Sequence, residues 1–201
     1  SSLNKTWQPV FAAAGVPFKA PKLVFYSQAG QSGCGAAQSA MGPFYCPADQ
    51  GIYLDTDFFA QMDRDLGAKG KFARDYVIAH EYGHHIQRLT GVSDQIRSLQ
   101  SQNPRQANAL SVRLELQADC FAGVWAHHAQ NARQILENGD IESAMNAAAK
   151  IGDDALQKQS QGRVVPESFT HGTSAQRTRW FNNGLQNGSV KGCDTFSAKN
   201  L

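Results

Sequence analysis

The residues best suited to chemistry form an H-E-x-x-H motif made by His80, Glu81 and His84. On a helix, histidines four residues apart lie one turn apart, so both imidazoles can reach one metal ion. Glu81 lies beside them, where its carboxylate can accept the proton of a metal-activated water. A chance match on an amphipathic helix, with packed histidines, is the alternative for so short a motif. The motif predicts a zinc site whose further ligand must come from elsewhere.

A catalytic zinc site needs a third protein ligand and an open fourth position. The metzincin solution, glycine at 87 and histidine at 90, is excluded because the chain has Gln87 and Thr90. Glu115 and Asp119, four residues apart on a second expected helix, offer another solution. Glu115 would bind the metal, and Asp119 would accept the outer N–H of a ligand histidine. A solvated acidic face is the alternative, but apolar residues surround the pair, so we predict one Zn²⁺ bound by both motif histidines and Glu115.

Three more histidines are rival ligands: His85, His127 and His128. His85 must point about 100° away from its neighbour in the motif. The adjacent pair on the second helix has no supporting carboxylate. We therefore interpret all three as surface residues or as residues that contact the metal ligands without binding the metal.

A hydrogen-bond donor is needed for the oxyanion that develops when a carbonyl is attacked. His171, in an expected loop just before a helix, is the candidate donor, and Arg177 is a candidate support for the oxyanion or the substrate. The alternatives are a simple loop histidine and an ordinary helix-surface charge. Phe44 and Tyr45 belong to an expected edge strand to which an extended substrate peptide could add its own backbone. An edge merely blunted by its flanking prolines is equally compatible with this segment.

A small sheet and a larger set of helices must position these residues. The periodicity predicts an amphipathic helix at 3–14, a strand at 22–26, a loop at 27–35 and a hairpin of 43–46 with 52–54. Helices are expected at 55–66 with an end at Gly67, and at 72–89, 105–130, 141–156 and 174–185, with a loop at 159–170. This order predicts an α+β fold in one domain over residues 1–201, with a small N-terminal antiparallel sheet and the metal-binding motif on the helix at 72–89.

Composition limits the partners and the compartment. The 201 residues include 19 Lys and Arg against 17 Asp and Glu, a net charge of +2 without a basic run, so nucleic acid and anionic lipid are not expected partners. No segment approaches the roughly 20 apolar residues that span a bilayer. We expect no membrane contact from this chain itself, and a removed N-terminal signal, anchor or pro-segment stays open. Four cysteines without a C-x-x-C pair favour two disulfides in an oxidising compartment, with buried thiols as the alternative.

Six sequence blocks resemble the bacterial "putative neutral zinc metallopeptidase" family, in order and over nearly the whole chain. The blocks are Cys34-Gly35, Gly42–Pro47, Ile52–Asp55, Ala79–Gln87, Glu115–Trp125 and His171–Arg177. The resemblance implies zinc and a gluzincin-like helical core with a small sheet. It also implies a domain outside the cytoplasm, in a family whose members often carry an N-terminal membrane anchor.

We therefore expect a zinc metalloendopeptidase that acts on peptide or protein substrates in the periplasm, in the cell envelope or after secretion. A zinc-containing envelope protein that binds a partner without turnover, and a metal-dependent amidase acting on cell-wall peptides, stay open as alternatives. A Cys34–Cys46 disulfide would brace the hairpin beside the cleft, and a Cys120–Cys193 disulfide would hold the C-terminal segment behind the metal site. Neither cleavage preference nor oligomeric state is predicted.

Overall fold

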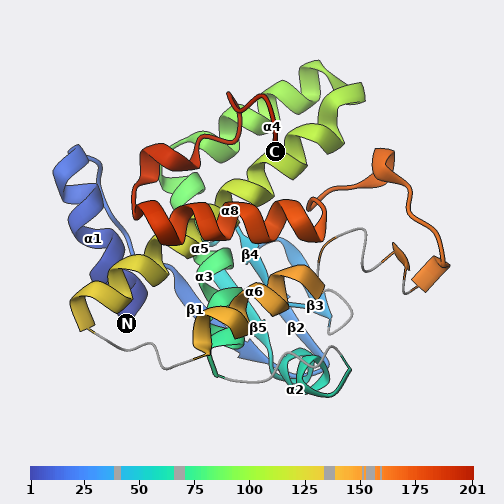
Figure 1. Ribbon diagram of the computed structural model, residues 1–201, viewed down its shortest axis with the longest axis horizontal. Helices are drawn as coiled ribbons and strands as arrows, with labels where there is room; N and C mark the ends of the chain where they lie inside the picture. Colours follow the sequence, from blue (N-terminus) through green and yellow to red (C-terminus); the bar gives the residue numbers. More distant parts are fainter. Residues whose placement is uncertain (39–41, 66–70, 134–138, 151, 153–156, 159) are drawn as a thin grey trace.

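The computed structural model describes residues 1–38, 42–65, 71–133, 139–150, 152, 157–158 and 160–201. A small sheet lies in the N-terminal part of the chain, and helices follow it to the C-terminus (Figure 1). The expected α+β class is confirmed.

The N-terminal helix α1 (Ser2–Ala14) agrees with the expected helix at 3–14. It begins at Ser1, whose hydroxyl accepts from the Asn4 amide, and it ends at Gly15, whose φ of 67° few residues other than glycine adopt. Trp7 and Phe11, one turn apart, are both buried. The helix therefore docks through one apolar face, on which Trp7 contacts the ring of Phe121 edge-on at 5.5 Å.

The main sheet has the strand order β1 (Lys22–Tyr26), β5 (Gly51–Asp55), β4 (Phe44–Cys46). β4 and β5 form the expected antiparallel hairpin, which leaves β4 at one edge. β1 pairs parallel to β5, so the sheet is mixed and the purely antiparallel sheet that we expected is wrong in this detail. A parallel pair needs a long connection, and here that connection contains β4 and a second hairpin.

The second hairpin is formed by β2 (Ala29–Ser32) and β3 (Gly35–Gln38), which pair antiparallel. We expected a loop at 27–35, and that prediction is wrong. The two strands contain only Ala, Gly, Gln and Ser, so they lack the β-branched and aromatic residues that indicate strands in a sequence. Asp49 joins the two hairpins because its carboxylate accepts from the Gly33 amide at 2.8 Å and from the Gly51 amide at 2.9 Å.

Within the residues that the structure describes, six longer helices follow the sheet, and five of them correspond to expected helices. They are α2 (Thr56–Asp65), α3 (Lys71–Leu89), α4 (Val92–Gln102), α5 (Ala107–Arg133), α6 (Asp140–Lys150) and α8 (Ser174–Asn187). Short 3₁₀ turns lie at η2 (Pro104–Gln106), η3 (Pro166–Ser168) and η4 (Val190–Cys193). We did not expect α4, whose sequence is largely polar and whose buried residue is Ile96. The expected end at Gly67 and most of the stretch at 151–156 lie outside the described residues.

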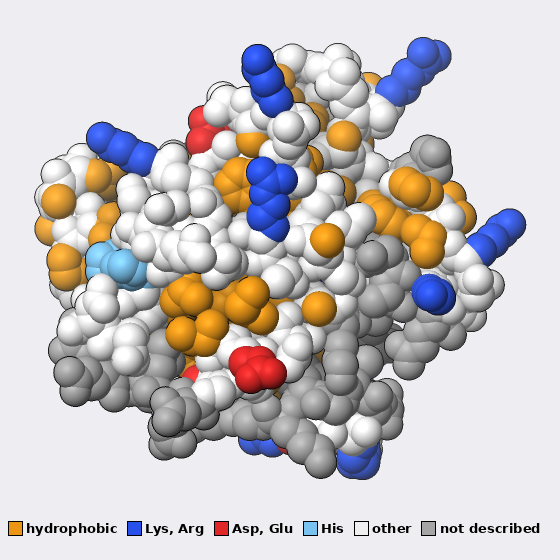
Figure 2. All heavy atoms as spheres, viewed as in Figure 1, with side chains coloured by type: hydrophobic (Ala, Val, Ile, Leu, Met, Phe, Trp, Pro, Cys, Tyr) orange, Lys and Arg blue, Asp and Glu red, His pale blue; other side chains and the backbone are white. Residues whose placement is uncertain are grey.

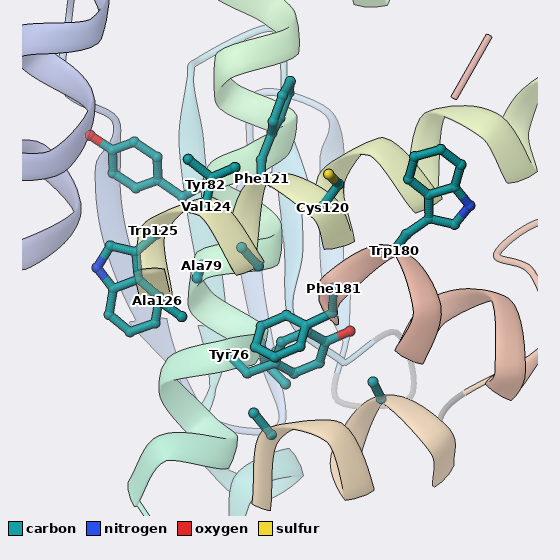
Figure 3. Close-up of a cluster of buried hydrophobic side chains, with 14 of the residues drawn as sticks. Tyr76, Ala79, Tyr82, Cys120, Phe121, Val124, Trp125, Ala126, Trp180 and Phe181 are labelled. Atoms are coloured by element: carbon teal, nitrogen blue, oxygen red, sulfur yellow. The ribbon is translucent and has the colours of Figure 1, made fainter. Parts of the chain in front are cut away.

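Helices α3, α5 and α8 pack closely enough to exclude side chains at their crossings. A Cβ atom on Gly83 of α3 would lie 3.0 Å from the Ala118 Cα of α5. A Cβ atom on Gly184 of α8 would lie 2.0 Å from the Cys120 carbonyl oxygen of α5. Figure 3 shows side chains of all three helices in one apolar cluster, where the Tyr76 and Phe181 rings meet edge-on at 5.3 Å. This packing fixes the relative position of the helices that carry the predicted metal ligands.

Two surface properties bear on the expected partners. Within the described part of the chain, no helix combines the length and the apolar character needed to cross a bilayer. On the face drawn in Figure 2, Lys and Arg side chains stand apart from one another and do not gather in one basic patch.

Candidate metal centre

The motif histidines lie on α3, and α5 places a carboxylate opposite them. The His80 and His84 rings are nearly perpendicular, with centroids 4.8 Å apart. The Glu115 Oε2 atom lies 2.8 Å from Nε2 of His80 and 3.2 Å from Nε2 of His84. One ligand atom from each of the three residues lies within 4.8 Å of the other two. The structure thus brings together the three side chains from which we predicted a zinc site.

The outer nitrogen of each histidine has a partner that determines its tautomer. His80 Nδ1 lies 2.8 Å from Asp119 Oδ1, and His84 Nδ1 lies 2.8 Å from Gln87 Oε1. Because an ionised carboxylate and an amide oxygen only accept, each Nδ1 must donate a proton. In a neutral imidazole the Nε2 atom then carries the lone pair. Both lone pairs are directed at Glu115.

Three acceptor atoms that converge in a buried site repel one another unless protons or a cation lie between them. Burial opposes charge on His80 and His84, but the carboxylates of Asp119 and Glu115 outweigh it, raising the pKa of His80 to about 10 and also raising that of His84. Burial likewise opposes charge on Glu115, yet the two histidines hold its pKa well below the usual value. Two imidazole nitrogens and a carboxylate oxygen are a known ligand set of catalytic zinc, so the residues present fit Zn²⁺.

Asp119 is fully buried and accepts hydrogen bonds from three side chains. Tyr76 Oη donates to Oδ1 at 2.5 Å, His80 Nδ1 donates to the same oxygen, and Arg177 Nε donates to Oδ2 at 2.9 Å. Burial raises the pKa of this carboxyl, but Arg177 and His80 outweigh burial and hold the pKa at about 2. Asp119 is therefore an ionised acceptor for His80, as the spacing of Glu115 and Asp119 led us to expect.

Arg177 contacts the site from behind Asp119. Its side chain is 5% exposed and contacts both Asp119 oxygens. We had expected Arg177 near the oxyanion or the substrate. Its contact with Asp119 indicates instead that it orients Asp119, which in turn orients the predicted ligand His80. Tyr76 and Gln87 were not predicted at all. Each lies on α3 within four residues of a motif histidine, a spacing that identifies residues on the same helix face.

Glu81 follows His80 directly and is 8% exposed. Burial raises the pKa of its carboxyl, while His80 and His84 act in the opposite direction and Glu115 adds to the increase. The carboxyl of Glu81 is therefore held close to the metal ligands and is easier to protonate than an exposed glutamate.

His171 lies in the segment between η3 and α8 and is exposed, with Nδ1 2.9 Å from the Thr170 hydroxyl oxygen. The next residue, Gly172, lies against α5, since a Cβ atom there would be 3.0 Å from Leu116 Cδ2. Leu116 follows Glu115, so this segment passes over the part of α5 that carries the third predicted ligand. The role of His171 as a hydrogen-bond donor to the oxyanion stays a prediction.

The predicted edge strand is linked to α3 next to the metal ligands. Tyr45 Oη lies 2.8 Å from Nδ1 of His85, whose Nε2 lies 2.5 Å from the Lys19 carbonyl oxygen. His85 is fully buried, so the interpretation of this residue as a surface residue is wrong. Phe44 stacks on Tyr53 of β5 with centroids 5.0 Å apart.

The two other histidines that we weighed lie three turns beyond Glu115 on α5. His127 Nδ1 is 2.7 Å from the Leu185 carbonyl oxygen, and His128 Nε2 is 2.8 Å from that of Gly188. Both therefore contact the C-terminal end of α8 and not the ligand triad.

Both expected cysteine pairings are present. Cys34 and Cys46 form a disulfide between the second hairpin and β4, with Cα atoms 5.8 Å apart. Cys120 and Cys193 form a disulfide between α5 and η4, with Cα atoms 5.5 Å apart. The second disulfide is buried and begins at the residue that follows Asp119.

Comparison with known proteins adds a family and several relatives. A family model described as "Putative neutral zinc metallopeptidase" matches residues 1–196. The uncharacterized protein YpfJ of Escherichia coli K12 is 57% identical over 198 residues, which cover 98% of this chain and 68% of YpfJ. The uncharacterized protein Rv2575 of Mycobacterium tuberculosis is 43% identical over 211 residues, which cover 100% of this chain and 69% of that protein. No solved structure matches the chain significantly.

Proposed function

The chain belongs to the putative neutral zinc metallopeptidase family, and on this premise we propose that it is a zinc-dependent endopeptidase that hydrolyses peptide bonds in proteins or peptides. The observation that carries the proposal is the convergence of three acceptor atoms from His80, His84 and Glu115, with the buried carboxyl of Glu81 beside them. A single Zn²⁺ bound there would polarise a substrate carbonyl and lower the pKa of a water molecule.

Glu81 is the general base of the proposed reaction. Its carboxylate takes a proton from the attacking water and later gives a proton to the leaving amine. A buried carboxyl suits both steps because burial raises its pKa toward the pH at which it works. His80 and His84 act in the opposite direction, which keeps the ionised form available as the base.

Three further residues are assigned to the substrate. His171, in the segment that passes over α5 beside Glu115, donates to the developing oxyanion. Phe44 and Tyr45 lie on β4, whose position at the sheet edge supports the addition of an extended peptide as a further strand. Arg177 acts on the reaction through Asp119 and His80.

A location outside the cytoplasm belongs to the same proposal. The two disulfides support it, because disulfides form and persist in oxidising compartments. A periplasmic, envelope or secreted protein of this kind would meet peptide substrates there.

The experiment is a comparison of the parent with Glu81→Gln on a denatured-protein peptide library and on cell-wall fragments, with and without chelator. We expect the parent to cleave peptide bonds in the library and the chelator to stop it. Glu81→Gln should retain zinc and lose at least about 100-fold in rate. Glu142→Gln, the same change at an exposed residue of α6, is the control.

Equal cleavage by Glu81→Gln would remove the proposed base. If the protein cleaved only the cell-wall fragments and not the peptide library, the proposal of an endopeptidase would give way to that of a cell-wall amidase. Zinc binding without turnover of either substrate would leave a binding protein.

A further inference from the structure

A row of buried amides connects His84 to the C-terminal segment. Gln87 Oε1 lies 2.8 Å from His84 Nδ1, and Gln87 Nε2 lies 3.0 Å from Gln117 Oε1. Gln117 Nε2 in turn lies 3.1 Å from the Cys193 carbonyl oxygen. Both glutamines are buried, Gln87 fully. Three hydrogen bonds therefore run from a predicted metal ligand on α3, across α5, to η4.

Backbone carbonyls determine the direction of every bond in this row. Gln87 Nε2 also lies 2.8 Å from the Leu114 carbonyl oxygen, and a carbonyl can only accept. The NH₂ group of Gln87 must therefore face Leu114, and the NH₂ group of Gln117 must face Cys193. Each amide then presents its oxygen to the next donor, so the proton of His84 is held on Nδ1. The lone pair on Nε2 is left for a metal.

The two histidines are thus oriented by different means. His80 depends on Asp119, whose partners Tyr76 and Arg177 belong to helices of the packed core. The row behind His84 ends at Cys193, in the short turn η4. Two contacts hold this carbonyl in place: the disulfide between Cys193 and Cys120 of α5, and the hydrogen bond that Asn183 of α8 donates to the Gly192 carbonyl oxygen.

We propose that Gln87 and Gln117 are positioning residues for His84, and that the Cys120–Cys193 disulfide strengthens zinc binding by holding the carbonyl that ends their hydrogen-bonded row. Removal of the disulfide frees Cys193 to move, so Gln117 loses its fixed acceptor. The amide of Gln87 is then held by the Leu114 carbonyl alone and no longer by Gln117 as well. Gln87 Oε1 then holds Nδ1 of His84 less rigidly, and the Nε2 lone pair is less well aligned with a metal ion. The inference rests on the proposed function only in taking zinc as the ion bound.

The test measures metal binding and not catalysis. Zinc dissociation constants of the full chain are obtained by competition with a chromophoric chelator, and the ligand geometry is followed by the d–d absorption of the Co²⁺-loaded protein. We expect Gln87→Leu and Gln117→Leu to weaken zinc binding by about 10-fold to 100-fold, as loss of groups behind metal ligands does, and to change the Co²⁺ bands. The double variant Cys120→Ser/Cys193→Ser should change both quantities in the same direction.

Matched variants separate this effect from a general loss of stability. Gln100→Leu removes an amide that bridges α4 to the Ala107 carbonyl and the Ser111 hydroxyl of α5 and has no bond to the row of amides. Cys34→Ser/Cys46→Ser removes the other disulfide. Both controls should keep the parental zinc affinity and the parental Co²⁺ spectrum.

If Gln117→Leu kept the parental zinc affinity and Co²⁺ spectrum, the row of amides would not position His84. The same result in Cys120→Ser/Cys193→Ser would show that the disulfide has no role in zinc binding. Should the cysteine variant fail to fold, Gln117→Leu decides alone. A parent that binds zinc but cleaves no peptide would disprove the proposed peptidase and leave this inference intact.

Discussion

The guanidinium of Arg177 binds both carboxylate oxygens of Asp119, with Nε 2.9 Å from Oδ2 and Nη2 3.2 Å from Oδ1. Asp119 uses one of these oxygens to accept from Nδ1 of His80. A residue of α8 therefore sets the orientation of a predicted metal ligand on α3 through a residue of α5. All three side chains are buried, so solvent screens this ion pair little.

Arg177→Leu should destabilise the protein by about 3–5 kcal/mol, because it leaves the Asp119 carboxylate buried without its counter-charge. Arg177→Lys should cost less but still weaken zinc binding, since a lysine cannot make the two parallel hydrogen bonds of a guanidinium. Urea unfolding and zinc competition measure the two effects. Arg179→Lys, at the exposed arginine two residues further along, should change neither, and an equal loss there would argue against a specific role of Arg177.

Glu115→Ala should abolish tight zinc binding, because two histidines alone leave the ion without its third protein ligand. The zinc content of the protein is measured by elemental mass spectrometry after dialysis against a zinc buffer. Glu142→Ala provides the matched control on the exposed face of α6. Undiminished zinc in Glu115→Ala would move the third ligand to another residue.

The metal-free protein should lose stability as the pH rises from about 6.5 to about 10. The folded-state pKa of His80 is raised to about 10, chiefly by Asp119 acting against burial, whereas an unfolded histidine has its ordinary pKa near 6.5. The contribution of His80 is therefore complete below the unfolded value and disappears as the pH passes the folded value. Urea unfolding of the protein, made metal-free with a chelator, at several pH values measures this trend.

With zinc bound, the stability of the protein should instead rise with pH, because the metal competes with protons for the Nε2 atoms of His80 and His84. Zinc affinity should fall as the pH is lowered, and binding should release protons near neutral pH. Calorimetry in buffers of different ionisation enthalpy counts those protons. Binding without proton release would contradict the raised pKa values of the two histidines.

Gly184→Ala should destabilise the protein by at least about 1–3 kcal/mol, because the new methyl group would lie 2.0 Å from the Cys120 carbonyl oxygen unless α5 and α8 separate. Gly192→Ala is the control, since the nearest atoms to its Cβ would lie at 3.6 Å or more. Thermal unfolding of both variants compares them. Equal stability would show that the crossing of α5 and α8 tolerates separation.

The sequence predicted the three-residue metal set because each member depends on local helix geometry and on one known chemistry. Asp119 was predicted for the same reason. Tyr76, Gln87 and Gln117 were not, since a tyrosine or an amide in a helix gives no sign of its partner until the packing of α3 against α5 is known. The placement of Arg177 depends likewise on the packing of α8 against α5.

The errors in the fold have physical causes of the same kind. The hairpin of β2 and β3 is built from small and polar residues, and its position depends on Asp49 and on the disulfide at Cys34, neither of which is a local signal. The parallel pairing of β1 with β5 is a long-range contact that hydrophobic periodicity does not encode. Helix α4 buries little apolar surface, so its sequence resembles that of a loop.

The hydrogen bond between Tyr45 and His85 has a mechanical consequence. One peptide bond joins His85, which holds the edge strand β4, to His84, which faces Glu115. The edge strand and the two ligand histidines are therefore both attached to α3, and a shift of α3 along its axis would carry them together. A peptide backbone added to β4 would therefore keep its position relative to His80 and His84 through such a shift.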